Sequence, residues 1–206
     1  FFNQGGNSFR KTDLLAGVAA GDQTAIVGWQ RSGDTYSFIV AQSNYESESV
    51  PSKLLQIDFE NGQRRRQKVV AECVPTIGSL ALADYDGDGD VDLFAGGRVV
   101  PGRYPEPASS FFFKNVNGDF QPDSVNGATV AHFGLVSAAT FSDIDGDGDA
   151  DLILAVEWGA VTIFENDAGV FRDATQKYGL ASYLGWWNGV ATGDLNNDGL
   201  LDIVAT

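Results

Sequence analysis

Three nine-residue segments of the chain carry acidic or amide side chains at alternate positions. They begin at residues 84, 143 and 194, and a short apolar run follows each of them. Carboxylates crowded into one short loop repel one another, so we expect a cation at the centre of each loop. Calcium takes roughly six to eight oxygen ligands, and loops of this kind supply them from alternate positions along the chain.

The pattern predicts three calcium sites with ligands at positions 1, 3, 5, 7 and 9 of each loop. Position 7 is predicted to contribute its backbone carbonyl, because Leu200 occupies it in the third loop and cannot bind a metal through its side chain. The side chains of Asp90 and Asp149 at the same position therefore need not be ligands. The predicted ligands are Asp84, Asp86, Asp88, Asp90 and Asp92 in the first loop, Asp143, Asp145, Asp147, Asp149 and Asp151 in the second, and Asp194, Asn196, Asp198, Leu200 and Asp202 in the third.

Other metal motifs fit these loops less well. An EF-hand needs a bidentate glutamate at position 12 and a helix on either side. Position 12 is instead Ala95, Leu154 or Ala205, and the residues around it favour strands. Magnesium prefers fewer protein ligands, and zinc would need a cluster of histidine and cysteine. Each set of predicted ligands comes from one loop without a neighbouring base or nucleophile, so the sites are predicted to be structural.

A second phrase recurs between the loops and predicts the elements that hold them. Aromatic residues flank an Asn/Gly-rich turn at 113–120, 164–171 and 2–9, a pattern typical of β-hairpins. A weaker copy of the unit begins at 17–22 and reaches a hairpin at 55–63. Its loop carboxylates are missing, so we interpret it as a unit that has lost its ion.

Short β-rich runs and a period of roughly 55 residues predict an all-β fold, a partial β-propeller of about four blades. A β-sandwich and a β-solenoid are the alternatives. Because propellers close with about four to eight blades, we expect this chain to be a fragment of a propeller of about seven or eight, or to be completed by another chain. The predicted units are 1–13, the end of a preceding blade; 14–75, a blade without calcium; 76–130 and 131–185, blades with calcium loops; and 186–206, the start of a further blade with a loop.

The charge of the chain limits its partners and location. The net charge is −15, from 28 acidic and 13 basic residues, and there is no basic stripe for nucleic acid. A single cysteine excludes an internal disulfide, and no segment is apolar enough to span a bilayer. The chain opens on Phe1 rather than methionine, so we expect that an upstream segment, such as an export signal, has been removed. Calcium sites of low affinity, as in extracellular modules, stay empty at the low calcium concentration of the cytoplasm. This predicts an extracellular, cell-surface or periplasmic protein.

At the acidic loops the chain resembles the FG-GAP/VCBS repeat family, whose propeller blades share this loop with integrin α-subunits. It is also similar to bacterial ASPIC/UnbV-type proteins at residues 96–105, 171–175 and 185–189. The resemblance implies a secreted or surface-attached propeller of about seven blades with no established catalytic centre.

Three functions are consistent with the sequence. The first is a calcium-stabilised module for protein binding, glycan binding or cell adhesion. The second is a polysaccharide lyase, in which Arg98, Arg103 and Lys114 would meet an acidic substrate. The third is a subunit of a surface complex whose other blades lie on another chain. The predicted partner contacts, which could equally be packing residues between blades, are Arg98, Arg103, Tyr104, Trp158, Trp186 and Trp187.

Overall fold

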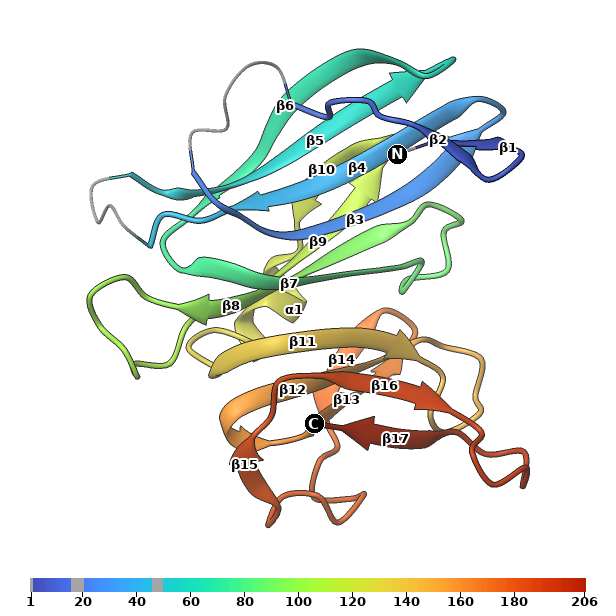
Figure 1. Ribbon diagram of the computed structural model, residues 1–206. Helices are drawn as coiled ribbons and strands as arrows, with labels where there is room; N and C mark the ends of the chain where they lie inside the picture. The colour runs from blue at the N-terminus through green and yellow to red at the C-terminus, as the bar shows by residue number, and fades with distance from the viewer. Residues whose placement is uncertain (1, 16–20, 46–49) are drawn as a thin grey trace.

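The computed structural model describes residues 2–15, 21–45 and 50–206, and in these ranges the chain is all-β apart from one short helix, α1 (Ser124–Thr129). The start of the weak repeat, at residues 17–20, lies outside the described residues. Antiparallel sheets follow one another from the N-terminus to the C-terminus, so that sheets adjacent in the sequence are adjacent in space (Figure 1). Within the described ranges, no helix has the length and apolar character needed to cross a membrane.

Each larger sheet is built from strands consecutive in the chain. A small hairpin of β1 (Phe2–Gly5) and β2 (Ser8–Arg10) precedes the first of them. The first four-stranded sheet contains β3 (Gln23–Ser32), β4 (Thr35–Gln42), β5 (Ser52–Glu60) and β6 (Gln63–Cys73). The second contains β7 (Thr76–Ala83), β8 (Asp92–Val99), β9 (Phe111–Val116) and β10 (Asp119–Pro122).

The C-terminal half repeats this arrangement and adds one strand. The third sheet contains β11 (Leu135–Ser142), β12 (Asp151–Ala160), β13 (Thr162–Asp167) and β14 (Val170–Asp173), and β15 (Leu184–Trp186) pairs with the far end of β12. A final hairpin contains β16 (Val190–Gly193) and β17 (Asp202–Ala205). The first strand of each sheet contacts the first strand of the next, from β3 to β7, from β7 to β11 and from β11 to β16.

The predicted hairpins are present, and the turns after Phe113 and Phe164 have positive φ at both central residues, which the Asn117-Gly118 pair favours and Ala168 adopts less readily. The turn between β9 and β10 places Asn117 at φ +55° and Gly118 at +89°, and the turn between β13 and β14 places Ala168 at +50° and Gly169 at +85°. Positive φ at both central residues matches the right-handed twist of the paired strands. Asparagine and glycine tolerate this conformation better than other residues.

The hydrophobic core lies between successive sheets. The apolar runs after the first two acidic loops are strands buried on both faces, whereas the run after the third loop, β17, is partly exposed. In β8, Phe94 packs into the core toward the third sheet, whereas Leu93 and Ala95 pack into the core toward the first. In β12, Leu152 packs toward the second sheet and Ile153 toward the final hairpin. Because side chains alternate along a strand, a strand between two cores must be apolar at every position.

Candidate metal centres

Each acidic loop joins the first strand of a sheet to the second, so all three loops lie at the same end of the stacked sheets (Figure 1). The loops connect β7 to β8, β11 to β12 and β16 to β17. Position 9 of each loop is the first residue of the second strand: Asp92, Asp151 or Asp202. The fold therefore anchors one end of every loop in a sheet.

The backbone of each loop is folded around the aspartate at position 1. The amide of the position 6 glycine donates to this carboxylate in all three loops, at 2.9–3.0 Å. The position 6 glycines have φ values of +90°, +100° and +86°, where a side chain would strain the backbone. Glycine at this position therefore lets the loop turn sharply back toward position 1. The pairs are Asp84 with Gly89, Asp143 with Gly148, and Asp194 with Gly199.

Two loops bring three carboxylates together. In the first loop, oxygens of Asp84, Asp86 and Asp88 lie within 4.8 Å of one another. In the second loop, the same holds for Asp143, Asp145 and Asp151. Oxygens at this separation can share one cation as ligands. Asp92 and Asp147 were also predicted as ligands but lie outside these two groups of three.

The third loop is arranged differently within the described residues, where its aspartates form no such group of three. Its position 3 is Asn196, whose amide donates to Asp198 at 3.0 Å. Asn196 also accepts from the amide of Asp198 at 2.9 Å. The backbone frame of the other two loops is nevertheless retained here, since Leu195 donates to Asp202 at 2.9 Å.

The first loop offers carboxylate oxygens that could serve as ligands, and it carries an excess of negative charge that a divalent cation would neutralise. Oδ1 of Asp86 is buried without a hydrogen-bond partner, although Lys114 donates to Oδ2 at 2.8 Å. Burial is the main reason that the pKa of the Asp92 carboxyl rises to about 7, and the negative charge of Asp86 adds to it. A hard cation would neutralise these carboxylates and satisfy the unpartnered oxygen, so the residues present fit such an ion.

Position 7 aspartates have a separate role, which the sequence did not reveal. Asp90 accepts from the amide of Asn117 at 3.3 Å, and Asp149 accepts from the amide of Ala168 at 2.9 Å. Both amides belong to the turn of the outer hairpin in the same sheet. These side chains therefore fasten the loop to its hairpin, whereas Leu200 at the same position of the third loop is exposed.

The pattern of the FG-GAP-like repeat matches the chain at residues 84–154 and again at 143–205. Together these matches cover more than half of the chain, and each begins at the first aspartate of an acidic loop. The chain belongs to the FG-GAP-like repeat family. A search of curated proteins gave no match.

Within each complete FG-GAP-like repeat, a buried asparagine of the hairpin ties the loop to its sheet. Asn166 donates through its side chain to the carbonyls of Tyr85 and Ala150, at 2.8 and 3.2 Å, and accepts from Gly169 at 2.8 Å. Asn115 donates to the carbonyl of Val91 at 3.0 Å in the equivalent way. Neither residue was predicted as functional from the sequence, although the recurring phrase Phe-x-Asn before each hairpin turn contains both.

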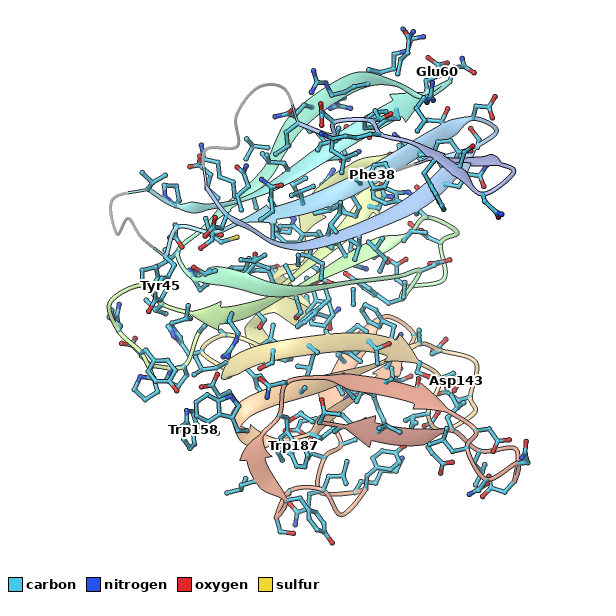
Figure 2. All side chains as sticks on the ribbon, viewed as in Figure 1. Phe38, Tyr45, Glu60, Asp143, Trp158 and Trp187 are labelled. Atoms are coloured by element: carbon cyan, nitrogen blue, oxygen red, sulfur yellow. The ribbon has the colours of Figure 1, made fainter. Side chains whose placement is uncertain are left out.

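Several of the residues predicted to contact a partner lie at the end of the sheets opposite the acidic loops. Figure 2 shows Tyr45 and Trp158 on one side of the molecule and Asp143 on the other. Arg98, Tyr104, Trp158 and Trp186 contact Glu157 or one another there.

The structure does not bring the remaining predicted contacts into that group. Arg103 pairs with Glu106, two residues beyond Tyr104 in the same connection. Trp187 packs against the core between β13 and the final hairpin. Lys114 lies beside the first acidic loop, where it pairs with Asp86.

Proposed function

We propose that the chain is a calcium-stabilised part of a β-propeller that works outside the cytoplasm as a binding module. Its ligand would be a protein or a glycan, bound in adhesion or within a surface complex, and it would not be catalytic. The observation that carries the proposal is the pair of carboxylate clusters, each fixed between the first two strands of a sheet of the FG-GAP-like repeat.

The arrangement of the sheets supports the propeller. Blades of a propeller are four-stranded antiparallel sheets that pack face to face around an axis. The first and second sheets have this form, and the third has it with β15 added. Their first strands contact one another in order, β3 with β7 and β7 with β11. Within each sheet the later strands lie progressively farther from its first strand. We therefore place the first strands, β3, β7, β11 and β16, nearest the axis.

In the proposed calcium sites, Asp84, Asp86 and Asp88 hold the first ion, and Asp143, Asp145 and Asp151 hold the second. The third ion would be held by the loop that begins at Asp194. Bound calcium would supply positive charge that offsets the repulsion within each loop. The protein contributes a preformed backbone frame, because amides within the loop already orient the position 1 carboxylate.

Each of the three basic side chains that a lyase would use to bind an acidic substrate is paired with a carboxylate. Arg98 pairs with Glu157, Arg103 with Glu106, and Lys114 with Asp86. An acidic substrate would have to displace these partners and approach a chain of net charge −15. These pairs favour a binding module over a lyase.

A closer kinship with ASPIC/UnbV-type proteins is part of the proposal. Two of the stretches that carry the resemblance, 96–105 and 185–189, supply residues to one surface depression in the structure. Arg98 and Tyr104 come from the first stretch, and Trp186 comes from the second.

Calcium titration by isothermal calorimetry tests the proposed function, because affinity decides where the sites can fill. We expect three ions per chain with dissociation constants of about 0.1–1 mM, as in extracellular modules. Sites filled below about 1 µM would be occupied in the cytosol and would contradict an exclusively extracytoplasmic role. Calcium-dependent cleavage of an acidic polysaccharide that is abolished by Arg103→Ala would contradict the non-catalytic assignment.

A further inference from the structure

Exposed aromatic side chains gather around one buried carboxylate at the end of the repeats opposite the acidic loops. Trp158, Trp186 and Tyr104 are 60%, 52% and 50% exposed, whereas Glu157 is only 3% exposed. The rings of Trp158 and Trp186 lie 4.8 Å apart at an interplanar angle of 53°. Single exposed aromatic side chains are common, but a contiguous group of them is typical of a binding surface.

Hydrogen bonds hold these rings in place before any ligand arrives. The phenol of Tyr104 donates to Oε1 of Glu157 at 2.6 Å and accepts from the indole N–H of Trp158 at 2.9 Å. Oε2 of Glu157 faces the guanidinium of Arg98 as an ion pair, without the alignment of a hydrogen bond. Trp186 is fixed from the other side, because its backbone pairs with Glu157 across β15 and β12. Preorganised side chains lose little conformational entropy when a ligand binds.

The backbone at Trp158 is held in an unfavourable conformation that positions its ring. Trp158 has φ +61°, in the left-handed region that bulky residues rarely adopt. The irregular register between β12 and β15 falls at this residue, between Glu157 and Gly159. Strained residues of this kind are held by the structure around them and cluster at binding and active sites.

The group borders a depression of about 450 Å³, which falls within the usual size range of small-molecule sites. Its wall combines aromatic faces with one carboxylate and one guanidinium: Tyr45, Arg98, Val99, Tyr104, Glu157 and Trp186. The charges of Glu157 and Arg98 balance, so neither a cation nor an anion is favoured. A neutral ligand with both apolar faces and hydroxyl groups complements this wall.

We infer that this depression, the Glu157 site, binds a neutral sugar unit of a glycan. The apolar C–H face of a pyranose ring would lie against Trp186 in the wall or against Trp158, which packs on Trp186. The sugar hydroxyls would bond to the exposed phenol of Tyr104 and accept from Arg98, both of which buried Glu157 holds in place. The inference rests on the proposed binding function and names the ligand class and the residues that recognise it.

Calorimetric titration of the calcium-loaded protein with neutral and charged probes tests the inference. The neutral probes are hexasaccharides of β-linked glucose, mannose and N-acetylglucosamine, and the charged probes are polygalacturonate and choline. We expect saturable binding of at least one neutral hexasaccharide and none of the charged probes. Absence of binding to all three neutral probes, or a preference for a charged one, overturns the inference.

Two variants locate the binding, and a third serves as a control. Trp186→Ala removes one ring, and Trp158→Gly removes the other while relieving the positive φ, so its melting temperature should not fall. Each should weaken binding at least about tenfold. Phe9→Ala truncates an aromatic residue of similar exposure (63%) in the N-terminal hairpin and should leave binding unchanged.

Wild-type affinity in folded Trp158→Gly and Trp186→Ala would also overturn the inference. Thermal unfolding with and without calcium separates the two proposals. A protein that calcium stabilises but that binds no neutral glycan contradicts only the glycan site, whereas loss of the calcium effect contradicts the proposed function itself.

Discussion

At the scale of single residues, aspartates only a few positions apart in one loop have different surroundings. Asp145 contributes an oxygen to the carboxylate cluster of the second loop, whereas Asp149 accepts a hydrogen bond from a hairpin amide. The first contact is between like charges and favours a cation. The second is satisfied by the protein alone. A substitution at Asp145 should therefore change the stabilisation by calcium, whereas a substitution at Asp149 should not.

We predict that Asp145→Asn reduces the stabilisation by calcium and leaves the calcium-free protein as stable as before, or slightly more stable. Removing one carboxylate weakens one site, which is worth about 2 kcal/mol at millimolar calcium, and relieves repulsion when calcium is absent. Denaturant unfolding in calcium and in EDTA measures both effects.

Asp149→Asn is the matched control for this prediction. It weakens the bond to the amide of Ala168, so it should cost about 1 kcal/mol equally in calcium and in EDTA. The assignment of roles would be wrong if the two variants lost the same amount of calcium-dependent stability.

At the scale of elements, the outer hairpin and the acidic loop of each repeat form one hydrogen-bonded unit. Asp151 accepts from the amides of Ile144 in its own loop and Asn166 in the hairpin, both at 2.8 Å. Asn166 in turn reaches back to Ala150, and across to Tyr85 in the preceding repeat. Asn166 thus ties the second acidic loop to its own sheet, and it ties the first acidic loop to the neighbouring third sheet.

We predict that Asn166→Ala lowers the free energy of unfolding by roughly 2–3 kcal/mol, because it leaves buried backbone groups without partners. It should also weaken calcium binding at the second loop, since the hairpin no longer supports the loop. Asp167→Ala, next in the chain, removes only an exposed ion pair with Arg172 and should cost less than about 0.5 kcal/mol. Denaturant unfolding of the two variants checks the contrast, and equal losses would refute it.

The sequence predicted the hairpins and the loops because both depend on local features. Glycine at position 6 and the Asn-Gly turn at Asn117 have conformational preferences that are visible in the residues themselves. β15 and α1 were not predicted. β15 has three residues and forms by pairing with the edge of β12. α1 has six residues, and the side chain of Asp123 caps its first turn. Neither is long enough to leave a periodic pattern.

The candidate site was predictable in part for the same reason. The types and spacing of the aspartates indicated the carboxylate clusters, but the role of Asp149 depends on a turn about twenty residues away in the chain. For the Glu157 site, the sequence indicated Arg98, Tyr104, Trp158 and Trp186 as contacts, but their assembly around Glu157 required the tertiary structure. Arg98 and Glu157 come from different sheets and meet only when those sheets stack.

At the scale of the whole molecule, the two ends of the stacked sheets are chemically different. One end carries the three acidic loops, and the other carries the aromatic residues around Glu157 (Figure 2). The cores between the sheets join these ends, because β8 and β12 each begin at an acidic loop and are buried on both faces. Calcium at one end would therefore stabilise the scaffold that positions the residues at the other end.

Thermal unfolding of the wild-type protein in 2 mM calcium and in excess EDTA, about 2 mM being a typical extracellular concentration, tests this account most directly. Three sites worth about 2 kcal/mol each should raise the melting temperature in calcium by on the order of 10 °C. Magnesium at the same concentration should restore little of this shift, because it holds its water ligands more firmly. Coincident melting curves in calcium and EDTA would contradict the claim that the loops are calcium sites that stabilise the fold.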